Sequence, residues 1–267
     1  MVMPSLRQPI VFVHGFLGFD YLRLGRWRLA SYWSNLPDAV RAAGNRVFVA
    51  RVAPLGSVAE RAGQLKAFIE EHCPREPVHL VAHSMGGLDS RYMISRLGMD
   101  SRVLSLTTLA TPHRGTPFAD WGLRRLFPVF SAFFDMFGIK KRAIEDLSVA
   151  SCRRFNDEVP DAPDVRYFSV AGRFESSWLT PAWQMSWKII KKEQGDNDGL
   201  VPVTSASYGE DTALWEGDHI SLVNFPDPFN RATRRWPDRT AAYGGLLRRL
   251  ALIDTGKPQR ENLLLGV

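Results

Sequence analysis

The sequence is poor in cysteine and has no long apolar run. Its two cysteines, Cys73 and Cys152, are far apart and have no metal-ligand spacing, so we expect two free thiols, with one disulfide as the alternative. No apolar stretch reaches the roughly 18 residues of a transmembrane helix. The first residues lack the pattern of a signal peptide. We therefore expect a cytoplasmic protein, while secretion by another route or earlier processing stays open.

The sequence also has no internal repeat, low-complexity tract or Pro/Ser-rich linker. Its 267 residues, 45% hydrophobic and 23% charged, are expected to form a single domain over 1–267 with an ample core. The formal net charge is +6, but the basic residues are spread over several segments, with acidic residues elsewhere. We interpret this charge mainly as a solvated surface, with attraction to anionic interfaces as the alternative. No nucleic-acid partner is predicted, and no protein partner can be inferred.

Short apolar runs alternate with helical patterns along the chain. Continuous apolar runs are typical of strands covered on both faces, and helices expected at 33–44 and 57–73 would supply part of that cover. In the second helix, Leu65, Phe68 and Ile69 lie on one face. The alternation predicts an α/β fold with a mostly parallel central sheet and helices on both faces. The expected strands are 9–15, 45–52, 77–84, 102–112 and 165–172, with a weaker sixth at 212–219.

Two aromatic-rich segments, 117–147 and 178–190, interrupt the alternation. Each segment carries a stripe of aromatic residues at helical spacing, and either stripe taken alone is explained by packing on the core. Both segments follow expected strand ends, where α/β sheets bind ligands, so we also expect them to cap an apolar pocket. The first is the candidate helical lid and the second a candidate cap segment. Their stripes consist of Phe127, Phe130, Phe134 and Phe137, broadened by Phe133 and Met136, and of Trp183 and Trp187.

The stretch HLVAHSMGGLDSRY, residues 79–92, has the pattern of a strand, a sharp turn and a helix. In a nucleophile elbow a serine occupies such a turn, and the residues two before and two after it must be small. Gly86 meets this requirement after Ser84, and Ala82 adds only a methyl group before it. We therefore predict that Ser84 is a nucleophile. Its hydroxyl then needs a base, a group that orients the base, and donors for an oxyanion.

The base is expected late in the chain, because the order on this fold is serine, acid, histidine. Among six histidines, His219 alone follows the last expected strand, and His113 is the rival. We expect His83, next to the serine, to point away from the hydroxyl's partner. Asp198, followed by glycine and LVP, is the expected acid, with Asp196 as the alternative in the same turn-rich loop.

Backbone N–H groups are the expected oxyanion donors. Gly15, in the VHGF that ends the first strand, lets the backbone approach the site, and Phe16 then offers its N–H. The second N–H would come from Met85, directly after the nucleophile. This chemistry needs no cofactor, and none is predicted.

Together these motifs resemble the α/β-hydrolase fold and, within it, the bacterial true lipases (triacylglycerol lipases). The elbow Ala-His-Ser-Met-Gly is similar to that of a lipase group in which alanine replaces the first glycine. The resemblance implies a triad of Ser84, Asp198 and His219, oxyanion N–H groups on Phe16 and Met85, and a lid at the Phe-rich segment. The motifs in the family's order are VFVHGFLG, LVAHSMGGLDSRY, LTTLATPHRGTPFADW, NDGLVP and GDHISLVN.

Two departures from that family concern a metal and a disulfide. Larger members bind structural calcium through an aspartate two residues after the histidine, where this chain has Ser221, and no paired acidic ligand is evident around Ser176. Calcium requires carboxylate ligands, so we predict no metal site. The family's disulfide has no counterpart in Cys73 and Cys152.

We predict a serine-dependent lipase that hydrolyses esters of acylglycerols, or of other lipids, through an acyl-enzyme at a lipid–water interface. A carboxylesterase of short soluble esters and an acyltransferase that uses the same acyl-enzyme are the alternatives. A non-catalytic binding module would have lost a triad residue, and none is lost here.

Overall fold

A computed structural model describes residues 3–18, 21–24, 27–129, 141–175, 181–225 and 238–255. Its centre is a six-stranded sheet in which every neighbouring pair of strands is parallel. The predicted parallel sheet is confirmed, and all six expected strands are present. In sheet order they are β4 (Val47–Val49), β1 (Ile10–Val13), β5 (Val78–His83), β6 (Val103–Leu109), β7 (Arg166–Arg173) and β8 (Asp211–Glu216).

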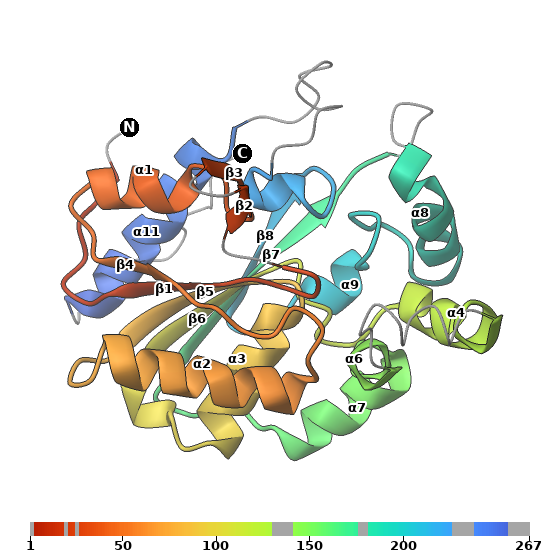
Figure 1. Cartoon of the computed structure of the whole chain (residues 1–267), viewed down its shortest axis with the longest axis horizontal. Helices are drawn as coiled ribbons and strands as arrows, with labels where there is room; N and C mark the ends of the chain where they lie inside the picture. Colours follow the sequence, from red (N-terminus) through yellow and green to blue (C-terminus); the bar gives the residue numbers. More distant parts are fainter. Residues whose placement is uncertain are drawn as a thin grey trace.

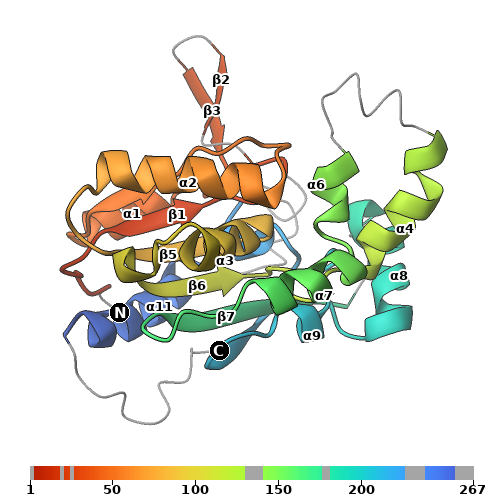
Figure 2. The same cartoon turned by 90° about the horizontal axis from the view of Figure 1, so that it is seen from below.

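Helices cover both faces of the sheet (Figures 1 and 2). Helices α2 and α3 lie on one face, and α1 and α11 lie on the other. Helices α4, α6 and α8 gather beyond the carboxyl ends of the strands (Figure 2). The bounds are α1 (Leu36–Ala42), α2 (Val58–His72), α3 (Met85–Arg96), α4 (Pro117–Arg125), α6 (Lys141–Glu145), α7 (Val149–Glu158), α8 (Pro181–Gln194), α9 (Val203–Ala206) and α11 (Thr240–Asp254), with short 3-10 turns at Asp100–Arg102 and Ser221–Val223.

The inner strands β1, β5, β6 and β7 are buried on both faces because each contributes to two cores. On β1, Ile10 and Phe12 join the core that includes residues of α1 and α11, whereas Val11 and Val13 join the core that includes residues of α2 and α3. Burial of one such side chain stabilises the fold by about 1.5–3 kcal/mol. This two-sided packing fixes the sheet on which the strand ends present their loops.

The helix predicted at 57–73 is observed as α2. The Ser57 hydroxyl caps its first turn by accepting the N–H of Glu60 at 3.4 Å. Leu65 and Ile69 are fully buried and Phe68 is half-buried, as the predicted face requires. The helix ends at His72, and Cys73 follows in a non-helical conformation.

The antiparallel hairpin of β2 (Tyr21–Leu24) and β3 (Trp27–Ser31) was not predicted. It projects from the body of the domain (Figure 2). Its basic residues obscure the short alternation of apolar and polar residues that would predict two strands.

Both cysteines are free and buried, which confirms that prediction. Burial raises the pKa of each thiol, to about 12 for Cys152. No helix within the described ranges is long and apolar enough to cross a bilayer. In the two expected cap segments, residues 130–140 and 178–180 lie outside the described ranges, so the aromatic stripe beyond Phe127 stays a prediction.

Candidate active site

Ser84 occupies the turn between β5 and α3, as the elbow motif predicts. Its backbone has φ 54° and ψ −131°, a region that non-glycine residues rarely adopt. The conformation is held on both sides. The Ser84 N–H donates to the Leu109 carbonyl at 2.8 Å, and the Ser84 carbonyl accepts the Thr111 hydroxyl at 2.7 Å. The strained turn therefore presents the Ser84 side chain at the carboxyl edge of the sheet.

Close packing explains why small residues surround the serine. A Cβ at Gly86 would stand 2.7 Å from the Val13 carbonyl oxygen and 2.8 Å from that of His14. Ala82 is fully buried on β5, where it pairs with Val13 on β1. The structure thus accommodates the extra methyl group of Ala82 but leaves no room for one at Gly86.

Asp198 and His219 form a buried, hydrogen-bonded pair. The His219 Nδ1–H donates to Asp198 Oδ2 at 2.8 Å, and the His219 backbone N–H donates to the Asp198 carbonyl at 2.9 Å. The other carboxylate oxygen, Oδ1, accepts the N–H groups of Leu200 at 2.9 Å and Val201 at 2.7 Å. These bonds fix the carboxylate, and in the neutral imidazole they favour the tautomer whose proton is on Nδ1, so that Nε2 can accept a proton.

Asp198 follows β7 in the chain, with the expected cap segment, observed as helix α8, between them. The loop returns to the strand end because the Phe174 N–H donates to the Asn197 carbonyl at 3.2 Å. A strand end can therefore supply the acid after a helical insertion.

The two rival residues occupy other environments. Asp196 is exposed, and the Lys191 ammonium group at 2.7 Å lowers the pKa of its carboxyl. His113 is fully buried, stacks on Tyr208 with ring centroids 4.2 Å apart, and lies 3.0 Å from the Thr108 hydroxyl through Nε2. Burial lowers its pKa far below the usual value. Neither residue lines the cavity that contains Ser84.

The peptide between Gly15 and Phe16 is held by hydrogen bonds to its carbonyl, so the Phe16 N–H faces away from the groups that donate them. The Gly15 carbonyl accepts the His14 Nδ1–H at 2.9 Å and the Gly18 N–H at 3.1 Å. Because a trans peptide is planar, its N–H points opposite to its C=O. Burial lowers the pKa of His14 to about 4, so this ring stays neutral.

The preceding peptide is held equally firmly. Arg61 Nη2–H donates to the His14 carbonyl at 2.6 Å, and the Gly15 N–H donates to the Tyr32 hydroxyl at 3.2 Å. Arg61 is itself fully buried and paired with Asp89 at 2.7 Å. Tyr32 and Arg61 were not predicted to contribute to the site, because their contacts with the loop depend on the assembled fold.

Two backbone N–H groups remain for a ligand. Within the described residues, the N–H groups of Phe16 and Met85 donate no hydrogen bond. Met85 begins helix α3, whose first N–H groups carry partial positive charge. Within the described residues Ser84 Oγ makes no hydrogen bond to His219, and such catalytic hydrogen bonds often tighten only when substrate binds.

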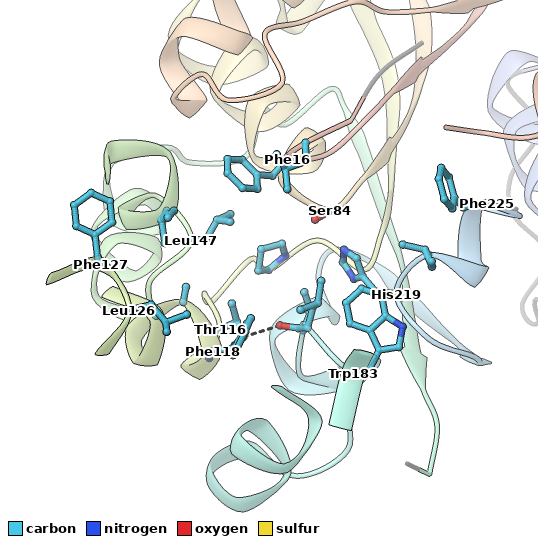
Figure 3. A pocket seen from close by; sticks show the side chains of 18 of the residues that line it. Phe16, Ser84, Thr116, Phe118, Leu126, Phe127, Leu147, Trp183, His219 and Phe225 are labelled. Atoms are coloured by element: carbon cyan, nitrogen blue, oxygen red, sulfur yellow. Dashed lines mark hydrogen bonds between the residues drawn. The ribbon is translucent and has the colours of Figure 1, made fainter. Parts of the chain in front are cut away.

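Ser84 and His219 open onto one cavity of about 470 Å³. In Figure 3 they lie between Leu126, Phe127 and Leu147 at one end and Phe225 at the other. Both expected cap segments contribute to the wall. The lining residues are Phe16, Leu17, Tyr32, Ser84, Pro112, Thr116, Phe118, Ala119, Gly122, Leu126, Phe127, Ile144, Leu147, Trp183, Leu200, Val201, His219, Ile220 and Phe225.

Trp183 and Trp187, four apart on α8, have different partners. Trp183 lines the cavity, whereas the Trp187 indole N–H donates to the Phe174 carbonyl at 2.8 Å. The aromatic pair is therefore partly pocket wall and partly structural support.

A second Ser-His-Asp group lies at the amino end of β5. The Ser105 hydroxyl is 2.7 Å from His79 Nδ1, and His79 Nε2 is 3.3 Å from Asp254 Oδ1. Ser105 and His79 are fully buried, and neither lines the cavity. Hydrogen bonding alone thus does not identify a reactive serine, whereas access to a cavity separates Ser84 from Ser105.

The prediction for His83 was wrong. Its ring faces the histidine loop, with its centroid 4.6 Å from that of His219. The strained turn directs Ser84 toward the cavity and His83 behind it.

Known proteins resemble this chain in sequence and in structure. The family described as "PGAP1-like alpha/beta domain" matches residues 63–224, a stretch that includes Ser84, Asp198 and His219. "Triacylglycerol lipase 2" of Saccharomyces cerevisiae is 35% identical over 205 residues, which cover 73% of this chain and 62% of that protein. "Triacylglycerol lipase" of Pseudarthrobacter phenanthrenivorans is 29% identical, with 59% and 56% covered. The chain thus spans about three-fifths of the length of these relatives.

The crystal structure of Staphylococcus hyicus lipase superposes with a TM-score of 0.73 at 19% identity, covering 95% of this chain and 97% of that one. The mature form of the Bacillus licheniformis lipase BlEst2 gives 0.68 at 24% identity, with 87% and 92% covered. These similarities show that the chain has the α/β-hydrolase fold.

Proposed function

This chain belongs to the PGAP1-like α/β domain family, and we propose that it is a serine-dependent lipase that hydrolyses carboxylic esters of acylglycerols. The observation that carries the proposal is the convergence of three features on one apolar cavity. These are the strained backbone of Ser84, the buried Asp198–His219 pair, and the two backbone N–H groups that donate no hydrogen bond within the described residues. The names of the relatives agree with it.

In the proposed reaction, His219 Nε2 takes the Ser84 proton while Oγ attacks the ester carbonyl carbon. Asp198 keeps the imidazole oriented through Nδ1 and stabilises its positive charge. The imidazolium then gives its proton to the leaving alcohol, and the acyl group remains on Ser84. A water molecule activated by the same histidine releases the fatty acid and restores the serine.

The developing negative charge would be stabilised by the N–H groups of Phe16 and Met85. Both are backbone donors, so they need no rearrangement during the reaction. The supports of the Phe16 peptide, from His14 and Gly18, fix the donor direction in advance. Loss of one such donor typically costs about 10²–10³ in kcat.

The cavity favours substrates with long apolar chains. Its walls are almost entirely aliphatic and aromatic, apart from the groups at its centre. The leaving alcohol must lie beside His219 to receive a proton, so the acyl chain extends the other way, toward Leu126, Phe127 and Leu147 (Figure 3). This assignment makes the α4–α6 end of the cavity the acyl-binding end.

We further propose that the described parts of the cap segments meet a lipid surface. Val129, just after α4, is 72% exposed, and Met185 on α8 is 51% exposed. Leu17, at the cavity wall, is 57% exposed. Basic residues near α4 and α6 would favour an anionic surface. Movement of the cap would then gate access to the cavity.

The variants Val129→Ser and Met185→Ser test this surface. We expect reduced activity on emulsified triacylglycerol and unchanged activity on a dissolved short ester. Leu214→Ser is the matched control, because Leu214 is 43% exposed but lies on the edge strand β8, away from the cavity. Deletion of residues 123–140 should remove the preference for emulsion altogether. Equal activity of wild type and deletion on both substrates would contradict the lid.

The central test compares wild type with Ser84→Ala on nitrophenyl esters and triacylglycerols of increasing chain length. We expect Ser84→Ala to lower kcat by several orders of magnitude. A profile that declines with chain length would favour a carboxylesterase of short esters. Full activity of Ser84→Ala would refute the proposal.

A further inference from the structure

Tyr32 and His83 form a buried hydrogen-bonded bridge behind the candidate active site. The Gly15 N–H donates to the Tyr32 hydroxyl at 3.2 Å, and that hydroxyl lies 2.5 Å from His83 Nδ1. At the other end, His83 Nε2 lies 2.9 Å from the His219 carbonyl oxygen. His83 is fully buried and Tyr32 nearly so. The bridge thus links two loops that are more than two hundred residues apart in the chain.

The direction of each bond in the bridge follows from chemistry. A carbonyl oxygen can only accept, so His83 Nε2 must carry the proton that it donates to His219. His83 Nδ1 then accepts the Tyr32 proton, and the Tyr32 oxygen accepts the Gly15 N–H. Burial lowers the pKa of His83 far below its usual value, so the ring keeps this neutral form. Every group of the bridge is satisfied in one pattern of protons.

Each end of the bridge holds a backbone group next to a group of the proposed reaction. Gly15 precedes Phe16, the proposed oxyanion donor. The His219 carbonyl belongs to the residue that supplies the proposed base. The middle of the bridge, His83, is covalently joined to the proposed nucleophile. The bridge through His83 therefore fixes the positions of Ser84, Phe16 and His219 relative to one another.

We propose that Tyr32 and His83 are positioning residues that set the oxyanion loop and the histidine loop relative to Ser84. The inference rests on the proposed function. It assigns no contact between His83 and the reacting atoms. Displacement of a reacting group by about 1 Å can cost roughly a hundredfold in rate, so loss of the bridge should act on kcat.

The experiment begins with Tyr32→Phe, which removes one oxygen and keeps the ring at the cavity wall. We expect kcat for a dissolved nitrophenyl ester to fall about tenfold to a hundredfold, with KM within twofold of wild type. Tyr167→Phe is the matched control. Tyr167 is also buried, and its hydroxyl also accepts a backbone N–H, from Ala162 at 3.1 Å, but it lies in the core beside α2 and α3. Its loss should leave kcat unchanged.

A double-mutant cycle tests whether the two residues act as one unit. The variants are Tyr32→Phe, His83→Phe and both together, with urea unfolding of each. Because either change breaks the same bridge, we expect the double variant to have nearly the kcat of the slower single variant. His83→Gln retains a donor for the His219 carbonyl, so it should recover part of the kcat lost in His83→Phe. Should His83→Phe fail to fold, Tyr32→Phe against Tyr167→Phe decides.

Three outcomes would overturn the proposed positioning role of Tyr32 and His83. These are wild-type kcat in Tyr32→Phe, equal loss of kcat in Tyr167→Phe, and losses that multiply in the double variant. Failure of the proposed function is a separate result, because it would show as full activity of Ser84→Ala. An inactive Ser84→Ala together with a fully active Tyr32→Phe would refute only the positioning role of the bridge.

Discussion

Gly15 and Ser84 approach so closely that a side chain at Gly15 would overlap the serine. A Cβ at Gly15 would stand 2.6 Å from Ser84 Cβ and 3.1 Å from the His83 carbonyl oxygen. The loop that carries the proposed oxyanion donor is thus pressed against the elbow. The glycine of the VHGF motif is required by this contact.

Gly15→Ala should therefore displace the loop and lower kcat by about a hundredfold, with a smaller effect on stability. Steady-state kinetics on a dissolved ester measures the loss. Gly63→Ala is the control, because a Cβ there meets nothing within 4 Å. That change lies within α2 and should stabilise the fold by up to about 1 kcal/mol without altering kcat. A fully active Gly15→Ala would contradict the requirement for glycine at this position.

Ala82→Gly restores the usual first glycine of the elbow. Since Ala82 is already accommodated in the sheet, we expect kcat to stay within about twofold of wild type. The strand should lose about 1 kcal/mol of stability through the lost methyl group and the added backbone freedom. Urea unfolding measures the second effect. A large gain in kcat would show that the methyl group strains the active turn.

Gly122→Phe should shorten the acyl chains that the cavity accepts. Gly122 lines the cavity on α4, and a Cβ there meets nothing within 4 Å, so a large side chain can enter the space. Each methylene excluded costs about 0.8 kcal/mol, roughly fourfold in kcat/KM. Activity on a butyrate ester should persist while activity on long-chain esters falls. Gly122→Ala is the control, and an unchanged profile in Gly122→Phe would place the acyl chain elsewhere.

Asp89 should make stability depend on pH. Burial, opposed by Arg61, raises its pKa from the ordinary 3.8 to about 7 in the folded chain. Between these values the folded state holds a proton that the unfolded state has lost. The stabilising contribution is therefore complete below about pH 4 and is lost as pH rises to about 7, with a slope of up to about 1.4 kcal/mol per pH unit. Urea unfolding of wild type and Asp89→Asn across this range measures the difference, and a constant difference would contradict it.

Ser105→Ala should leave ester hydrolysis unchanged. Ser105 has a histidine and, through it, an aspartate, but its side chain is fully buried. The variant serves as a control for Ser84→Ala, since both remove one serine hydroxyl from a Ser-His-Asp group. Reaction of wild type with a phosphonate ester, followed by mass spectrometry, should label Ser84 and not Ser105. Labelling of Ser105 would reverse the distinction.

Local patterns were sufficient for the sheet and for the elbow. The inner strands could be predicted because burial on both faces favours apolar runs. The elbow could be predicted because close packing requires small residues at fixed offsets from Ser84. The hairpin β2–β3 was missed because its charges obscure a short alternation.

Contacts between distant segments could not be predicted in the same way. Tyr32 and Arg61 meet the loop after β1 only when the sheet and α2 are assembled. The orientation of His83 was misjudged because it depends on the strained turn at Ser84. A cap segment at 178–190 was expected, but the return of the following loop to the strand end was not, since backbone atoms that carry no sequence signal make that contact.

The adjacency of His83 and Ser84 bears on how this site can be redesigned. Elbow motifs are written with a wildcard before the serine, and a library built on that notation would randomise position 83. Here that position faces away from substrate, yet its ring is tied to the loops on both sides of the nucleophile. Variation aimed at substrate preference belongs on the cap, at sites such as Gly122, where an added side chain meets empty space.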